Sequence, residues 1–371
     1  MKTVRSSRVA IVVAVASVIG FAAPVAAATV PYPTAPLDSY NVKGTAYATL
    51  IVGDRVYVGG SFTQVKHNGI SYGYQNLAAF DVTTGALVLT FAPNPDKEVR
   101  ALASDGTSLF VGGKFISIGG AWRNRLASVD LATGVASTSF NADVGSRVDA
   151  VATDGSRVFF GGQFTSVDGT TRNRVAAVDV TTGDLDAWDP NANNNVTSIH
   201  LSPDATTAYV GGTFGTIAGT SRSKLVALST TTVAAVGTDF SGANSNVKSL
   251  DVSIDGTVLY AGDTGNDLEA YDVGTGAQLW QNEDAHGDIQ AVKVAGDNVY
   301  MGFHDGADAM TDARLAAVDA ASGATESDWN PTFQSTYGVF GIDATDEQLV
   351  IGGEFWQISG VAQDGVAIFA I

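Results

Sequence analysis

Val58-Gly59-Gly60-Ser61-Phe62 is the first copy of a short phrase that recurs along the whole chain. The other copies are Val111-Gly112-Gly113-Lys114-Phe115, Phe160-Gly161-Gly162-Gln163-Phe164, Val210-Gly211-Gly212-Thr213-Phe214 and Ile351-Gly352-Gly353-Glu354-Phe355, with weaker ones at Ala261-Gly262-Asp263 and Met301-Gly302-Phe303. The first glycines stand at positions 59, 112, 161, 211, 262, 302 and 352. Seven units at a period near 50 residues predict a repeat architecture, in which recurring residues are structural.

The third unit shows what one repeat contains. Residues 147–153 alternate as a strand, and Asp154-Gly155 is a tight-turn pair that closes hairpins. Residues 157–164, 174–179 and 185–188 indicate three more short strands, separated by loops rich in Gly, Thr and Asp. Four short antiparallel strands per unit, without a helical period, are typical of a propeller blade. We therefore predict an all-β fold, a seven-bladed β-propeller.

The glycine pairs and the aromatic residues of each unit favour packing roles. A Gly-Gly pair in a strand inside a sheet stack lets another backbone or a large side chain approach, and the following Phe is expected to fill space between blades. A phosphate-cradling loop is disfavoured because no helix follows. One aromatic stands in each fourth strand, which favours a packing layer over a sugar-stacking platform. These aromatics are Tyr40, Phe91, Phe140, Trp188, Phe240, Trp280 and Trp329.

The two ends of the repeat predict how the ring closes. The last unit stops at Ile371 inside its third strand, and a spare segment, Leu37–Asn41, precedes the first unit. This segment matches Ser137–Asn141 of a fourth strand in pattern. We expect the N-terminal strand to complete the last blade, which would remove two exposed sheet edges.

Residues 1–28 are typical of an export signal, and residues 29–371 are expected to form one propeller domain. Lys2, Arg5 and Arg8 precede an apolar run, and Ala26-Ala27-Ala28 offers a cleavage site. Cleavage would remove three of the 20 basic residues and none of the 38 acidic ones, leaving a net charge of about −21 (17 − 38). This charge argues against nucleic acid and against an anionic membrane surface as partners. The chain has no cysteine, so no disulfide framework is possible.

These features resemble secreted bacterial propellers built from a Gly-Gly-x-Phe repeat, the delta-60-like repeat proteins, which are related to the quinoprotein alcohol dehydrogenase-like group. The stretch Leu268–Trp280 is similar to the Ala-x-Asp-x-x-x-Gly-x-x-x-Trp repeat of the quinoprotein enzymes. Those enzymes usually have eight blades, and many carry adjacent cysteines near the cofactor. Seven units without cysteine depart from that pattern, so the resemblance implies shared strand packing and does not justify a quinone site.

Function is expected where the units differ, in the loops that share one face of a propeller. Tyr72 and Tyr74 stand in a long loop of unit one, Trp122 in unit two and Trp356 in unit seven. Exposed aromatics contribute most to contacts with a partner, so these four residues are our candidate ligand-binding residues. His200, in the first strand of unit four, is expected to be packed or hydrogen-bonded.

A second candidate is a cation site. Its members would be Glu283, Asp284, His286, Asp288, His304, Asp305 and Asp308. Such a set would suit Ca²⁺ or another divalent cation, but its spacing matches no established metal motif, and a solvated acidic loop is the competing interpretation. No cofactor is predicted.

The sequence thus favours an extracellular, monomeric and non-enzymatic module that binds protein or carbohydrate. The rival hypothesis is a secreted enzyme, a glycan hydrolase or lyase or a cofactor-dependent oxidoreductase, with an acidic, cation-dependent site. An enzyme would need a deep central pocket with converging ionisable groups, whereas a channel lined by small residues would argue against one.

Overall fold

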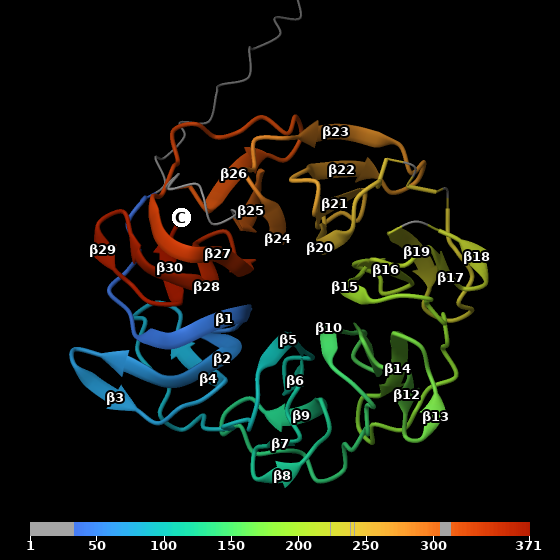
Figure 1. Cartoon of the computed structure of the whole chain (residues 1–371), viewed down its shortest axis with the longest axis horizontal. Coiled ribbons are helices and arrows are strands. Elements are labelled where there is room, and N and C mark those ends of the chain that lie inside the picture. Colours follow the sequence, from blue (N-terminus) through green and yellow to red (C-terminus); the bar gives the residue numbers. More distant parts are fainter. Residues whose placement is uncertain (1–32, 223, 238, 241, 305–312) are drawn as a thin grey trace, which may run out of the picture. The chain divides into compact units, whose positions relative to one another are not determined.

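Seven short strands surround a central channel. The structure, a computed structural model, describes residues 33–371 except 223, 238, 241 and 305–312, and residues 32–371 form one compact unit. Each innermost strand contacts the next, and β27 contacts β1, so the circle is closed (Figure 1). The innermost strands are β1 (Asn41–Val52), β5 (Val99–Ser104), β10 (Val148–Thr153), β15 (Val196–Leu201), β20 (Val247–Val252), β24 (Asp288–Ala295) and β27 (Phe333–Ala344).

Each innermost strand begins a blade, and we number the blades 1 to 7 in chain order. The second strands are β2 (Arg55–His67), β6 (Ser108–Gly113), β11 (Arg157–Gly162), β16 (Thr207–Gly212), β21 (Val258–Asp263), β25 (Asn298–His304) and β28 (Gln348–Ile358). The third strands are β4 (Leu77–Asp81), β9 (Leu126–Asp130), β14 (Val175–Asp179), β19 (Leu225–Ser229), β22 (Leu268–Asp272), β26 (Leu315–Asp319) and β30 (Val366–Ala370). All pairings are antiparallel, which confirms the predicted all-β propeller.

The fourth strand is a regular strand in blade 5 alone among the described residues, as β23 (Gln278–Asn282). In blades 1–4 and 6 it is reduced to one bridge, such as Val178↔Leu185. In blade 3 the Asp186 carboxylate accepts the backbone N–H of Trp188, a local hydrogen bond that competes with strand pairing.

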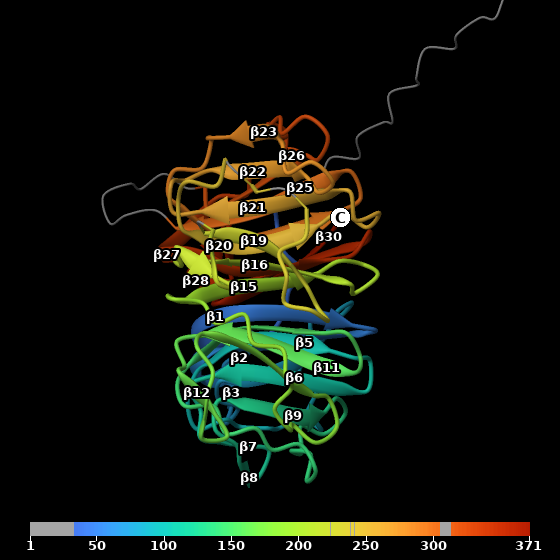
Figure 2. The same ribbon diagram turned by 90° about the vertical axis from the view of Figure 1, so that its right-hand side faces the viewer.

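Short hairpins extend the second strands of several blades at the outer rim. They are formed by β3 (Ile70–Tyr72) with β2, β7 (Ser117–Ile118) with β8 (Ala121–Trp122), β12 (Ser166–Val167) with β13 (Thr170–Thr171), β17 (Thr216–Ile217) with β18 (Thr220–Ser221), and β29 (Val361–Ala362) with β28. Figures 1 and 2 both place β8 at the periphery, far from the innermost strand β5 of the same blade.

The core consists of seven hydrophobic clusters, each between two neighbouring blades. Successive side chains of a second strand point to opposite faces of the sheet, so they pack against the blades on opposite sides. Phe160 joins the cluster with blade 2, and its neighbour Phe159 joins the cluster with blade 4. The five Phe residues of the repeated phrase are buried, as predicted. Burying one such side chain contributes roughly 1.5–3 kcal/mol.

The two glycines of the repeated phrase are required for different reasons. A Cβ on Gly161 would lie 2.3 Å from Cγ1 of Val196, a side chain of the next blade. A Cβ on Gly162 would lie 2.1 Å from the carbonyl oxygen of Arg147, immediately before the innermost strand of the same blade. The first glycine therefore leaves room for a side chain of the adjacent blade. The second leaves room for the backbone of its own sheet, where the strand register is irregular.

The N-terminal segment completes blade 7 as predicted, although its residues 37–40 do not form a regular strand. The backbone N–H of Leu37 donates to the carbonyl of Ile368 at 2.7 Å, and that of Val42 donates to Asp364 at 3.0 Å. The buried amide of Gln363 also donates to the Ser39 hydroxyl. The first and last parts of the propeller are therefore joined by hydrogen bonds. Within the described residues, no helix is long and apolar enough to cross a membrane.

Candidate functional site

A β-bulge interrupts the innermost strand of every blade. In blade 3 the register passes from Val148↔Gly162 to Ala150↔Gly161 and leaves Asp149 without a partner residue on the neighbouring strand. The same shift occurs at the equivalent position in the other six blades. A bulge re-aims the extra side chain, so we treat the seven extra residues as one set, the bulge residues. They are Tyr47, Arg100, Asp149, Thr197, Lys248, Gln290 and Phe340.

The bulge residues divide into an aromatic half and a polar half. In blades 7, 1 and 2, Phe340 meets Tyr47 edge-on at 5.6 Å between ring centroids, and the guanidinium of Arg100 lies 3.8 Å above the Tyr47 ring. In blades 3 to 6 the set consists of a carboxylate, a hydroxyl, an ammonium and an amide. The polar half carries groups that a ligand can recognise by hydrogen bonds.

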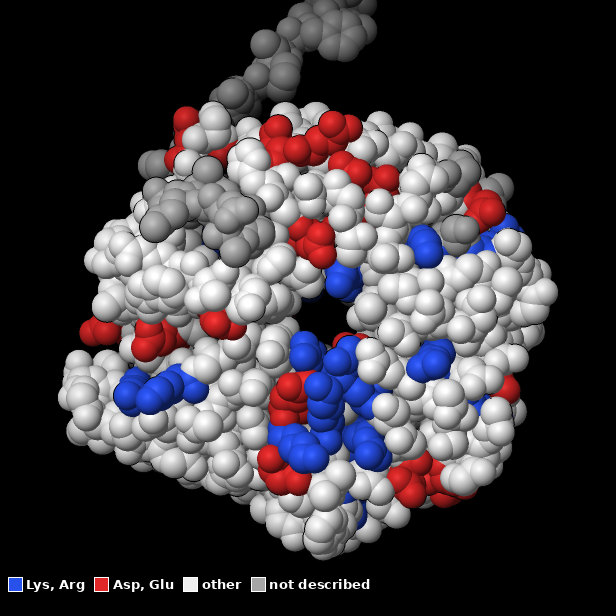
Figure 3. Space-filling view, viewed as in Figure 1, with Lys and Arg blue, Asp and Glu red and all other residues white. Residues whose placement is uncertain are grey.

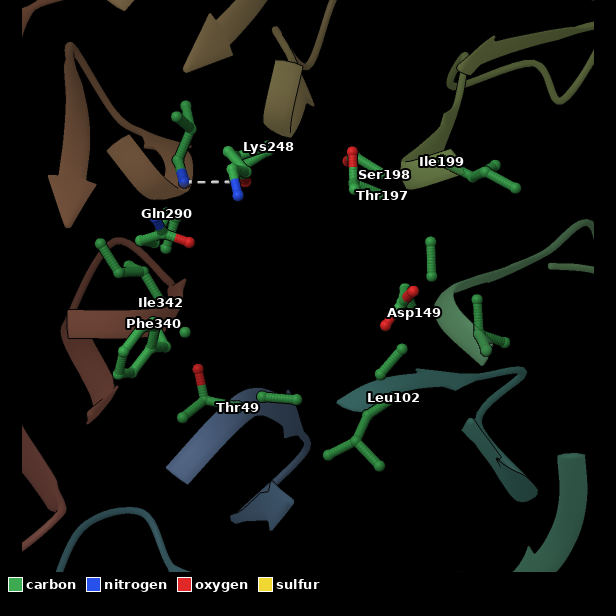
Figure 4. Close-up of a pocket in the computed structure, with 18 residues that line it drawn as sticks. Thr49, Leu102, Asp149, Thr197, Ser198, Ile199, Lys248, Gln290, Phe340 and Ile342 are labelled. Atoms are coloured by element: carbon green, nitrogen blue, oxygen red, sulfur yellow. Dashed lines mark hydrogen bonds between the residues drawn. The ribbon is translucent and has the colours of Figure 1, made fainter. Parts of the chain in front are cut away.

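The central channel contains a cavity of about 190 Å³ (Figure 4). Five bulge residues line it, namely Asp149, Thr197, Lys248, Gln290 and Phe340. The residue after each bulge is small in every blade and forms the narrow part of the lining. These residues are Ala48, Ala101, Ala150, Ser198, Ser249, Ala291 and Gly341. The cavity therefore combines a polar ring with a wall of small side chains.

Charged residues gather at one side of the channel mouth. Figure 3 shows Lys and Arg beside Asp and Glu on the rim below the central opening. Glu98 accepts from Arg100 at 2.9 Å and pairs with Lys114 at 3.0 Å, and Arg147 pairs with Asp149. Burial raises the pKa of Glu98, but its two cations outweigh burial and lower that pKa below its ordinary value.

The pKa of Asp149 is shifted in the opposite direction from that of Glu98. Its side chain is only 10 % exposed, and burial raises its pKa despite the neighbouring Arg147. Its Oδ2 atom has no hydrogen-bond partner among the described residues, although Figure 4 shows the carboxylate facing the cavity. The hydroxyl of Thr49, on the same cavity wall, is also buried without a partner there. Such groups are rare in folded proteins, so each one calls for a ligand or a water.

Three residues further along the same strands, a second set of side chains is fully paired. His200, Asp251, Lys293 and Asp343 occupy equivalent positions in blades 4 to 7. The Nδ1 atom of His200 lies 3.3 Å from Asp251, and Lys293 lies 3.6 Å from Asp251 and 3.2 Å from Asp343. We call this set the ionic chain. His200 is thus half-buried beside the carboxylate of Asp251.

Backbone groups complete the ionic chain across the ring closure. Asp343 accepts the backbone N–H of Ile51 in blade 1, and Asp251 accepts that of Val294 in blade 6. Burial opposes the charge of Lys293, but the two carboxylates outweigh burial and raise its pKa well above the ordinary value. Desolvation lowers the pKa of the His200 imidazole, which favours its neutral form.

The four aromatic candidates lie on three consecutive blades and away from the channel. Trp356 in blade 7 is 48 % exposed, and Trp122 in blade 2 is 73 % exposed. Tyr72 and Tyr74, in blade 1 between them, are half-buried against the cluster of blades 7 and 1, and the Tyr74 hydroxyl donates to the Leu89 carbonyl. The structure thus places the four residues in one sector of the outer rim, with the two tryptophans on separate hairpins.

The candidate cation residues do not converge within the described part of the chain, where no three His, Asp or Glu side chains could hold a metal ion. Asp284 accepts from Asn282 and Thr325, Glu283 accepts from Gln281, and His304 stacks on Tyr337. His286 and Asp288 do not line the central cavity either. Asp305 and Asp308 lie outside the described residues.

The channel residues were missed by the sequence reasoning, apart from His200. The recurring residues were assigned to the scaffold, and functional residues were then sought in the loops that differ between units. The available signal was an alignment of the first strands on their glycine pairs, in which the bulge position and the ionic-chain position differ between units while the positions around them stay apolar or small.

The fold and the site define a β-propeller with a small polar cavity on its axis. The sequence family described as outer membrane protein assembly factor BamB matches residues 75–331, so the chain belongs to that family. The match supports the expected relation to quinoprotein-like propellers. No curated protein matches the chain.

Two solved structures show the same fold at low identity. The WD40 β-propeller domain of Doa1 has a TM-score of 0.60 and 14 % identity, covering 90 % of this chain and 96 % of that one. The computationally designed Ika8 protein has a TM-score of 0.55 and 15 % identity, covering 91 % of this chain and 98 % of that one. At such identity the likeness shows the fold alone.

Proposed function

We propose that the protein is an exported, non-enzymatic propeller that binds a protein partner and serves in assembly. The observation that carries this proposal is the family match across residues 75–331, because that family is named for an assembly factor. The small side chains that follow the bulges offer few groups for catalysis, which agrees with a binding role. Export rests on the features of residues 1–28.

The outer-rim sector of blades 7, 1 and 2 is the proposed contact surface. Trp122 and Trp356 are large, exposed and carried on short hairpins of a rigid ring. Aromatic side chains of this kind dominate the free energy of protein interfaces. Tyr72 and Tyr74 would add contacts between them.

The test is affinity capture with cross-linking from the extracellular and envelope fractions of the source cells, followed by binding measurements with the purified partner. Trp122→Ala/Trp356→Ala is the test variant. Ile254→Ala is the matched control, because Ile254 is 96 % exposed in the turn between β20 and β21. We expect the double variant to weaken binding at least about a hundredfold, since each anchor contributes about 2 kcal/mol or more.

Three results would count against this proposal. If no protein is enriched, the binding role is wrong. If the double variant binds like the control, the surface is wrong. If soluble glycans compete for the same surface with higher affinity than the protein, the carbohydrate alternative replaces the protein one.

A further inference from the structure

The cavity on the propeller axis has the size and the lining of a site for a very small ligand. Its volume of about 190 Å³ lies below the roughly 300–1,000 Å³ of drug-sized sites. The lining comes from all seven blades, so the cavity depends on the closed ring and is rigid. A ligand there would have few atoms and would be recognised mainly by polar contacts.

The first polar contact is the carboxylate of Asp149. Nine-tenths of its side chain is buried, the carboxylate faces the cavity (Figure 4), and Oδ2 is buried without a donor among the described residues. Arg147 pairs with the other oxygen and leaves Oδ2 without a hydrogen bond. A ligand ammonium group would supply the missing hydrogen bond.

The second polar contact is the ammonium of Lys248, two blades further round the ring. Lys248 lines the same cavity, and no ion pair or hydrogen bond joins it to another residue in the described ranges. Every other lysine or arginine named at the mouth has a carboxylate partner. The cation of Lys248 is therefore available to a ligand anion.

The two charges have opposite sign and face one small space, with the Thr197 hydroxyl between their blades and Gln290 beyond Lys248. A neutral sugar would offer hydroxyls but would leave the ammonium of Lys248 without a counter-charge. A simple anion would satisfy Lys248 and repel Asp149. A zwitterion satisfies both, and the ring of Phe340 offers an apolar surface to a side chain.

We propose that the axial cavity binds a free α-amino acid, with its ammonium group at Asp149 and its carboxylate at Lys248. This site is independent of the outer-rim aromatics and of any protein partner. The amino acid stabilises the closed ring on binding, because the cavity exists only when all seven blades are in place.

The experiment is isothermal titration calorimetry and thermal unfolding of the purified protein with each of the free proteinogenic amino acids at millimolar concentration. For each amino acid that binds, the N-acetyl derivative removes the ammonium charge and the carboxamide removes the carboxylate. Neutral monosaccharides are tested in parallel. The variants are Asp149→Asn and Lys248→Met, with Asp328→Asn and Lys43→Met as exposed controls.

We expect at least one amino acid to bind and to raise the unfolding temperature, and both derivatives to bind at least about tenfold more weakly. We expect the same loss for both site variants and none for the controls. Unfolding of the unliganded variants at or above the wild-type temperature separates lost binding from lost folding.

The proposal is overturned if no amino acid binds, if the blocked derivatives bind as well as the free amino acid, or if binding survives in both site variants. Binding of monosaccharides alone would also overturn it, in favour of a sugar site. None of these outcomes bears on protein binding at the outer rim, because every ligand is a pure small molecule.

Discussion

Two positions on the innermost strands, the bulge position and the ionic-chain position, differ in whether their charged side chains have partners. At the bulge position, Asp149 has an oxygen without a donor and Lys248 has no partner among the described residues. At the ionic-chain position, three residues further on, Asp251, Lys293 and Asp343 have partners on neighbouring blades. Both sets lie on the innermost strands, so the fold alone does not decide the pairing.

The difference separates a structural role from a binding role. Paired charges link blades 4 to 7 to each other and, through Ile51, to blade 1. Removing one member leaves buried charges behind. The ammonium of Lys248 and the Oδ2 atom of Asp149 link no blades and remain available to a ligand. The predictions below test this contrast, beginning with the largest expected effect.

Lys293→Met should destabilise the protein most. The change leaves the carboxylates of Asp251 and Asp343 buried without their common cation, and Asp251 is 4 % exposed at its side chain. Breaking a buried ion pair costs about 3–5 kcal/mol. Urea unfolding followed by fluorescence should show this loss in the free energy of unfolding.

Lys43→Met is the control for Lys293→Met, since Lys43 is exposed. If Lys293→Met unfolds at the same urea concentration as the control, the ionic chain does not hold the ring. The variant Lys293→Met/Asp251→Asn/Asp343→Asn removes all three charges and should recover part of the loss.

Glu269 extends the comparison to a buried carboxylate whose hydrogen-bond donors are neutral. It accepts from the Tyr271 hydroxyl at 2.7 Å and from Gln278, and burial raises its pKa from 4.5 to about 7. The folded state therefore binds the proton more tightly than the unfolded state. Stability is highest below pH 4.5 for this group and falls as the pH rises towards 7, by roughly 3 kcal/mol.

Glu269→Gln should abolish that slope. Urea unfolding between pH 4.5 and 7.5 should show wild type losing stability relative to the variant as the pH rises. A variant that runs parallel to wild type across this range would mean that Glu269 titrates normally.

The sequence predicted the scaffold because packing demands recur. The first glycine of the phrase faces Val or Ile of the next blade in six units. Because each of these units must leave room for that side chain, each has glycine at this position. Closure by the segment around Tyr40 was predictable for the same reason, since a missing fourth strand and a spare one are visible as gaps in the period.

The channel was not predictable from one sequence. A bulge depends on register, and the sequence around Asp149 reads as an ordinary alternating strand. The shortened fourth strand of blade 3 was missed because Asp186 accepts the N–H of Trp188, a local hydrogen bond that alternation does not reveal. The exposure of Trp122, by contrast, follows from its place in an outer loop where the equivalent residues of units three and four are polar, Thr171 and Ser221.

Two threonines on the cavity wall allow a matched test at smaller scale. The Thr197 hydroxyl donates to the carbonyl of Val247 in the next blade, whereas the Thr49 hydroxyl has no partner in the described residues. Thr197→Val should therefore cost about 0.5–1.5 kcal/mol. Thr49→Val should be neutral or stabilising.

Thermal and urea unfolding of the two threonine variants, side by side, gives the measurement. Both substitutions make the same chemical change in the same cavity, so each serves as the control for the other. Equal losses in the two variants would show that Thr49 is hydrogen-bonded in solution and that the contrast between the sets is smaller than proposed.

Asp149→Asn should have the smallest effect on stability and the opposite sign to Lys293→Met. Burial raises the pKa of Asp149, so its ionised form disfavours folding, and removing the charge should stabilise the protein at pH 7 by less than about 1 kcal/mol. As the pH falls through the folded-state pKa, wild type protonates and the advantage of the variant should disappear. Unfolding measured from pH 7 down to pH 4 in both proteins checks this convergence. A loss of several kcal/mol in Asp149→Asn at pH 7 would instead place Asp149 with the ionic chain as a structural charge, and the two ends of the channel would then serve the same purpose.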